Sequence, residues 1–150
     1  MKQAGTTFAP SIWQRLTAPT TATMLTLDQH KRAITRDLEN LLNTRTAIPE
    51  DELAGLPLYR CSIANFGLAD FAQLSLSSSE DRKDICNQLE AAIARHEPRL
   101  SAVRVQLVQE VGVVNRLSFV ITAQLRAHDT GEQVRFDVML EPSSLHYSIR

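Results

Sequence analysis

Carboxylates are the side chains of this sequence that could do chemistry on their own, because two of them suffice to hydrolyse a glycosidic bond. Glu97, in the segment HEPRL, is the main candidate, with Asp70, Glu80 and Glu110 as candidate partners. The acid of such a pair must keep its proton near neutral pH, which usually requires apolar surroundings. Arg99 lies two residues from Glu97 and favours the charged carboxylate instead. The sequence therefore predicts a permanent anion at Glu97, which argues against an enzyme.

Neither nucleophilic catalysis nor metal binding has a motif in this sequence. No Gly-x-Ser-x-Gly elbow occurs, and no small-residue motif surrounds Cys61 or Cys86. Glycine-rich phosphate loops are absent as well. The histidines do not have the spacing of metal ligands, and they are His30, His96, His128 and His146. We therefore expect no metal, no cofactor and no catalytic residue.

Charge and hydropathy exclude two classes of partner. The chain has 150 residues and a formal net charge of −1. Nucleic-acid binding would need a clustered basic surface, and membrane insertion would need about 18 consecutive apolar residues. The first residues also lack the apolar core of a signal peptide, so export by that route is not expected. Cys61 and Cys86 are then expected as free thiols in a reducing cytosol, with Cys86 packing as a small hydrophobe.

Two amphipathic helices are predicted, at 28–43 and 79–96, joined by a loop at 44–61 and a turn at Gly67. Each helix has a capping box, formed by Thr26 with Gln29 and by Ser77 with Glu80. The two apolar stripes consist of Leu27, Ile34, Leu38, Leu41 and Leu42, and of Ile85, Leu89, Ala92, Ile93 and His96. The opposite face of the first helix is expected to be solvated, and it carries Lys31, Arg32, Arg36, Asp37 and Glu39.

After the second helix the apolar spacing changes from 3.6 residues to strict alternation. Turn residues separate the alternating segments, with Gly131 in HDTGE and the reversal EPSS. Alternation of this kind is typical of a half-buried antiparallel sheet. The alternating segments are 103–107, 117–126, 134–141 and 145–149. Helices followed by strands predict an α+β fold, with two main helices packed on one face of a three- to four-stranded antiparallel meander.

An extended N-terminal arm precedes this domain. Residues 1–25 are rich in Thr, Ala and Pro and show little periodicity, so we expect an arm at 1–25 and a folded domain at 26–150. The segment PSIWQRL interrupts the arm and is interpreted as a short anchor. In it, Trp13 with Ile12 and Leu16 at helical spacing is expected to form a packing plug.

The triplet Glu97, Pro98 and Arg99 lies where the second helix meets the first strand. Pro98 lacks an amide donor and disfavours helical geometry at Glu97, so the helix should stop there. In an extended backbone Glu97 and Arg99 would project to the same side. A cation suits a helix C-terminus and an anion does not. Capping therefore accounts for Pro98 and Arg99, whereas Glu97 favours a contact role for the triplet.

Four segments stand out along the chain: PSIWQRL (10–16), RAITRDLENLLNTR (32–45), SIANFGLADF (62–71) and HEPRL (96–100). Together they make the chain resemble the TssE family, the baseplate wedge proteins of type VI secretion systems, which are homologous to the wedge protein of contractile phage baseplates. Two departures from the family pattern are Ala69, where Pro is usual, and His96, where an aromatic residue is common. The first weakens the expected turn and the second changes the packing before the triplet.

The resemblance implies a cytoplasmic, non-enzymatic structural part of an injection machine, present in several copies. Its implied partners are the TssF and TssG wedge proteins and the subunits of the contractile sheath, whose assembly would start there. The acid–Pro–Arg triplet is a hallmark of the family and is associated with holding the wedge. The resemblance thus implies a partner-binding role for Glu97, Pro98 and Arg99.

The edge of the predicted sheet gives a second partner-binding hypothesis. The last strand runs to the final residue, and an unpaired edge invites strand addition by another chain. We therefore expect Leu145, Tyr147 and Ile149 to meet a sheath subunit.

Two other functions compete with the structural one. A muralytic, lysozyme-like enzyme would use the carboxylates described above. A small adaptor that binds a single regulatory protein could reuse the same fold.

Overall fold

The computed structural model describes residues 7–17, 24–71, 78–108, 117–126, 131–141 and 143–150. These residues form an α+β fold in which helices precede the strands of one antiparallel sheet, as the sequence predicts. In chain order the elements are α1 (Ile12–Thr17), α2 (Leu27–Leu42), η1 (Glu50–Leu53), α3 (Pro57–Arg60), η2 (Ile63–Asn65), α4 (Ser79–His96), β1 (Leu100–Val108), β2 (Leu117–Leu125), β3 (Gln133–Glu141) and β4 (His146–Ile149).

Helix α2 begins at the capping box that the sequence predicts. The amide of Gln29 donates to Thr26 Oγ1 (3.3 Å), and the amide of Thr26 donates to Gln29 Oε1 (2.9 Å). Two of the amides that have no partner within the helix are thereby satisfied. The helix ends at Asn43, whose amide donates to the carbonyl of Glu39 (3.0 Å).

Helix α4 spans the predicted residues, but its cap differs from the prediction by one position. Ser78 is the N-cap, and its hydroxyl accepts from the amide of Asp81 (3.3 Å). The prediction of a box that starts at Ser77 is therefore wrong, because the N-cap is one residue later, at Ser78. Ser77 itself lies outside the described residues.

The sheet is a four-stranded meander in the order β1-β2-β3-β4, with every pair antiparallel. Ile121 in the middle of β2 lies opposite Val105 of β1 and Phe136 of β3, and all three side chains are buried. Residues at the same alternation on each strand therefore form the core face, while the other face is largely polar and open. Strand β1 begins at Leu100, earlier than the alternation indicated.

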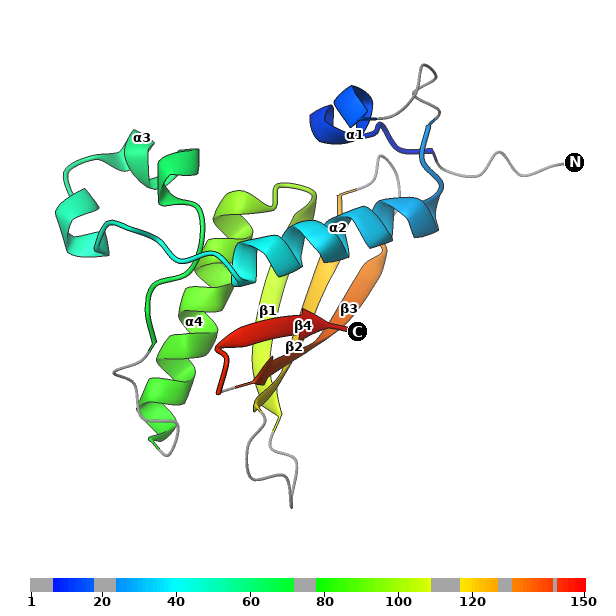
Figure 1. The fold of residues 1–150 in the computed structure, drawn as a ribbon. Coiled ribbons are helices and arrows are strands. Elements are labelled where there is room, and N and C mark those ends of the chain that lie inside the picture. The colour runs from blue at the N-terminus through cyan, green and yellow to red at the C-terminus, as the bar shows by residue number, and fades with distance from the viewer. Residues whose placement is uncertain (1–6, 18–23, 72–77, 109–116, 127–130, 142) are drawn as a thin grey trace, which may run out of the picture.

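Helices α2 and α4 cover the core face of the sheet (Figure 1). Helix α4 packs mainly against β1, and helix α2 contacts β4 and α4. Leu27 and His96, at the ends of the predicted stripes, are only partly buried, whereas the other stripe residues are enclosed in the core. These enclosed residues are Ile34, Leu38, Leu41 and Leu42 of α2, and Ile85, Leu89, Ala92 and Ile93 of α4.

The connection between the two long helices is more structured than predicted. Within 44–61, expected to be a loop, the chain makes two short helical turns, η1 and α3, and η2 follows. The amide of Leu56, for example, donates to the carbonyl of Leu53 (3.0 Å). Such turns are too short to show a helical period, so the sequence pattern missed them. These three short helices, η1, α3 and η2, form a lobe, which Figure 1 shows projecting beyond α4, away from the sheet.

The described part of the N-terminal arm lies against α2. Phe8 and Leu25 exchange two backbone hydrogen bonds (3.0 and 2.8 Å), and Phe8 is buried in the core. Helix α1 sits above α2 in Figure 1. Ile12 and Leu16 are 75% and 74% exposed, so the predicted packing plug is wrong for these two residues; the side chain of Trp13 lies outside the described part. The arm is fastened by Phe8 instead.

Candidate functional site

The triplet lies at the junction of α4 and β1, as the sequence predicts. Glu97 caps α4 through its amide, which donates to the carbonyl of Ile93 (2.8 Å), and its backbone is no longer helical (φ −120°, ψ 78°). Pro98 and Arg99 form the following turn. The carbonyl of Arg99 accepts from the amide of Arg126 (2.8 Å), which ties the turn to the end of β2. Pro98 is exposed, whereas Glu97 is only 3% exposed.

Glu97 and Arg99 bind each other, because the non-helical backbone directs both side chains to one side. Arg99 Nε donates to Glu97 Oε1 (2.6 Å), and a guanidinium terminal nitrogen, Nη2, donates to Oε2. The amide of Arg99 adds a third donor to Oε1 (3.2 Å). Bidentate hydrogen bonds between a guanidinium and a carboxylate are among the strongest side-chain hydrogen bonds in proteins. Glu97 is thus satisfied within the protein.

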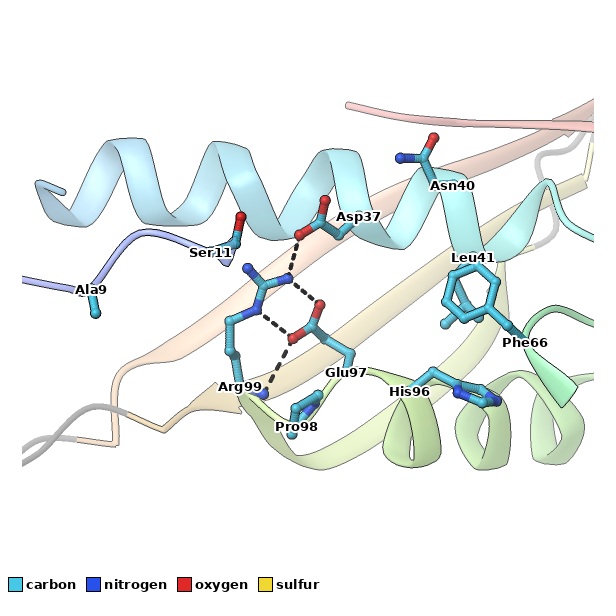
Figure 2. A pocket seen from close by; sticks show the side chains of 10 residues that line it. All are labelled: Ala9, Ser11, Asp37, Asn40, Leu41, Phe66, His96, Glu97, Pro98 and Arg99. Carbon is cyan, nitrogen blue, oxygen red and sulfur yellow. Dashed lines mark hydrogen bonds and ion pairs between the residues drawn. The ribbon is translucent and has the colours of Figure 1, made fainter. Parts of the chain in front are cut away.

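Asp37 of α2 completes the cluster, although the sequence pattern does not predict its participation. Arg99 Nη2 donates to Asp37 Oδ2 (2.7 Å), so one guanidinium connects α2 to the turn that follows α4 (Figure 2). Its charge predicts a solvated helix face for Asp37. Its position three residues after buried Ile34 and four before buried Leu41 places it at the border of the apolar stripe, and this spacing is the signal in the sequence.

The charges of the cluster stabilise one another. Burial alone would lower the pKa of the Arg99 guanidinium, but hydrogen bonds and the negative charges of Glu97 and Asp37 outweigh it and raise that pKa above its ordinary value. The side chain of Arg99 is 26% exposed and that of Asp37 is 35% exposed, against 5% for Glu97. The two outer members therefore remain accessible, and Glu97 acts through Arg99.

A cavity of about 420 Å³ opens beside this cluster. Figure 2 shows the charged groups between Ala9 and Ser11 on one side and Phe66 and His96 on the other. Burial lowers the pKa of the His96 imidazole, and its Nε2 lies 3.0 Å from the carbonyl oxygen of Asn65. The cavity is lined by Ala9, Ser11, Asp37, Asn40, Leu41, Phe66, His96, Glu97, Pro98 and Arg99.

The second candidate region, the β4 edge, is a mixture of exposed and enclosed groups. Leu145 precedes the strand with a positive φ of 52° and is 47% exposed, and Ile149 is partly buried. Tyr147 is 1% exposed, so its side chain belongs to the core. The outward backbone of the strand is engaged by α2: the amide of Tyr147 donates to Asn43 Oδ1 and its carbonyl accepts from Asn43 Nδ2, both at 2.8 Å.

The remaining sequence candidates do not gather around Glu97. Asp70 and Glu80 are exposed and do not line the cavity, and Glu110 lies outside the described residues. Both cysteines are free thiols; Cys61 is exposed, and Cys86 is partly buried against the core, where burial raises its pKa. Within the described ranges no cluster of His, Cys, Asp or Glu could hold a metal ion. Nor do these ranges contain a helix long and apolar enough to cross a membrane.

The fold and the site define a class of small α+β structural modules, in which buried charges join the module's own helices and sheet. The family model described as "Baseplate wedge protein gp25" matches residues 28–130, more than half of the chain. The chain belongs to this family, which includes the TssE proteins. Its role is therefore that of a structural component of a phage or type VI secretion baseplate. No protein with a curated function matches the chain.

Proposed function

We propose that the protein is a cytoplasmic structural component of a type VI secretion baseplate, which joins the wedge complex to the contractile sheath and helps start sheath assembly. The observation that carries the proposal is the family match over residues 28–130. The TssE-like order of the segments at 10–16, 32–45, 62–71 and 96–100 supports type VI secretion over a phage tail. The proposed partners are TssF, TssG and the sheath subunits.

We assign wedge docking to the triplet and its cavity. Pro98 is exposed, and the partly exposed Arg99 and Asp37 offer a charged rim that another protein could contact. Glu97 contributes by fixing the guanidinium of Arg99. The same geometry argues against muralytic catalysis, because the carboxylate of Glu97 accepts three N–H donors and is poorly placed to release a proton.

A bulky substitution at the cavity rim tests wedge docking without breaking the ion pairs. Asn40 is exposed on α2 and lines the cavity, so Asn40→Trp should block a partner and leave the fold intact. Arg32→Trp places the same side chain at an exposed position two turns earlier on α2. Pull-down of co-expressed TssF and TssG should fail for Asn40→Trp and succeed for Arg32→Trp. Equal recovery with both variants would refute docking at this cavity.

We assign sheath contact to the β4 edge, with Leu145, Tyr147 and Ile149 as the residues involved. Tyr147 would contribute its backbone, because its side chain is in the core. Strand addition there requires Asn43 and Glu39 to release the amides of Tyr147 and Ile149 (2.8 and 3.3 Å). Leu145 is the exposed apolar group at this edge and gives the cleanest variant.

Counting sheaths in cells tests this contact. Leu145→Asp should lower the number of sheaths while the variant protein stays soluble and still binds the wedge. Gln133→Asp introduces the same charge at an exposed position at the start of β3 and should leave sheath numbers unchanged. Deleting the last strand is unsuitable, since it also removes Tyr147 from the core. Normal sheath numbers with Leu145→Asp would refute the assignment.

A further inference from the structure

Phe8 holds the described N-terminal segment to the body of the protein through both its backbone and its side chain. Its backbone exchanges two hydrogen bonds with Leu25 (3.0 and 2.8 Å). Phe8 stacks on His30 of α2, with the ring centroids 4.2 Å apart and the planes 8° from parallel. Both residues are buried, at 8% and 6% exposure. A stacked aromatic pair adds to the stabilisation that comes from burying its area. The stack and the two backbone hydrogen bonds together fasten the arm at Phe8.

Beyond Phe8, the described arm has local side-chain hydrogen bonds, and two apolar side chains of α1 are exposed. The hydrogen bonds of Ser11 and Gln14 are exchanged within the segment itself (2.9 and 3.2 Å). Ile12 and Leu16 lie on α1 and face solvent. An element with little apolar burial has low local stability and can open without unfolding the core.

This weakly attached segment forms one wall of the triplet cavity. Ala9 and Ser11 line the cavity together with Asp37 and Arg99 (Figure 2). The charged cluster also acts on the fastening point, because Arg99 and Glu97 are close enough to influence the charge of His30. The arm, its fastening point and the exposed side of the cluster thus lie within one region.

We propose that residues 7–17 form a displaceable strap over the cavity beside Arg99, fastened by Phe8 on His30, and that a baseplate partner reaches the cavity by lifting this strap. The second half of the proposal rests on the proposed function, in which this cavity is the wedge-docking site. The first half concerns the protein alone. Lifting the strap breaks the Phe8 contact, which costs free energy. The partner binds the open state more tightly than the closed one, because only the open state gives access to the cavity, and this difference drives the lifting.

Tryptophan fluorescence tests the strap in the purified full chain, because Trp13 is the only tryptophan and belongs to the strap. In the wild type, time-resolved anisotropy should show Trp13 tumbling with the whole protein. Phe8→Ala should add a fast component on the nanosecond timescale of free chain segments. Ile12→Ala removes an exposed apolar side chain from the same segment and should not add it.

Folding of the body is followed in parallel by circular dichroism in urea. If Phe8→Ala lowers the unfolding midpoint of the whole protein, Phe8→Leu takes its place, since leucine fills the site but cannot stack. If a folded Phe8 variant shows the same anisotropy decay as the wild type, the proposal of a strap fastened by Phe8 is overturned.

Affinity for the co-purified TssF–TssG complex tests whether a partner reaches the cavity by displacing the strap. Phe8→Ala should bind more tightly than Ile12→Ala, by about tenfold if the strap is open in about one molecule in ten. Weaker or equal binding by Phe8→Ala would overturn displacement, because the arm would then belong to the interface or play no part in it. If even the wild type does not bind while Phe8→Ala releases Trp13, the strap stands and the proposed docking function fails.

Discussion

At the residue scale, Glu97 combines two roles: its amide ends α4, and its carboxylate is enclosed at the helix–sheet junction. An enclosed carboxylate without partners would be strongly destabilising. Arg99 supplies the opposite charge, and Asp37 holds the guanidinium from α2. Glu97, which capping alone cannot explain, is therefore the centre of an internal charge cluster. We call this cluster of Glu97, Arg99 and Asp37 the clamp, and Arg99 and Asp37 are its partly exposed members.

Removing Glu97 should destabilise the whole protein. Glu97→Ala removes three hydrogen bonds to a carboxylate and leaves the partly exposed Arg99 paired with Asp37 alone. The loss should cost about 1–3 kcal/mol. Urea denaturation should show this fall in the free energy of unfolding. Glu52→Ala, at an exposed position in η1, should change that free energy by less than about 0.5 kcal/mol. A Glu97→Ala protein as stable as the Glu52→Ala control would contradict the clamp.

His30 should make stability depend on pH. Burial, and then the positive charge of Arg99, lower the pKa of His30 below its ordinary 6.5, and Glu97 acts in the opposite sense. The unfolded chain consequently binds more protons at His30 below pH 6.5, so its contribution to stability is present above that pH and is lost as the pH falls. Urea midpoints should drop between neutral pH and about pH 5, and the drop should be smaller in His30→Gln. An identical drop in the variant would contradict this assignment.

The sequence predicted part of this cluster and could not predict the rest. Pro98 fixed the end of the helix, and an extended turn brought Glu97 and Arg99 to one side, as observed. Asp37 is 62 positions from Arg99, and its charge, rather than its helical phase, is what is typical of the solvated face. Only the crossing of α2 over the junction brings the two together, and that crossing depends on tertiary packing rather than on local pattern.

At the element scale, the described edges of the sheet are covered by side chains from the helices. Glu90 of α4 accepts from the amide of Val105 on β1 (2.8 Å), and Asn43 pairs with both backbone groups of Tyr147 on β4. Polar side chains in these positions satisfy backbone groups that would otherwise pair with another strand. Any strand added at either of these edges must therefore displace these side chains.

Gly67 should be required for the connection that carries the lobe back to α4. Its φ is +124°, and a Cβ there would lie 2.6 Å from the carbonyl oxygen of Thr44. Gly67→Ala should therefore lower the free energy of unfolding by about 1–3 kcal/mol, measured in urea. Gly55→Ala is the matched control, since a Cβ at Gly55 meets no atom within 4 Å. Equal stability of the two variants would show that the Gly67 turn is unstrained.

Elements with a long regular period were the predictable ones. The two long helices and the meander follow from apolar spacing, because each buries one continuous face. The lobe was missed because its turns bury few side chains, and Leu58 and Ile63 in it are 89% and 88% exposed. Leu145 shows a related limit: alternation placed it in the last strand, whereas it lies in the preceding turn.

At the scale of the whole molecule, internal ion pairs connect the helices to the turn that leads into the sheet. The protein's internal charges lock α2, α4 and the sheet together, and its described cavity-lining charges and exposed apolar residues lie at separate places on the surface. Membership of the baseplate wedge family agrees with this construction.

The most direct test of the account is the mass of the complex formed when the chain is co-expressed with TssF and TssG. Native mass measurement should find the 16.8 kDa chain in a stable assembly with both partners. The Asn40→Trp variant should remain folded and run free of them. A wild-type chain that is folded but found only by itself, with TssF and TssG assembled without it, would contradict the central claim.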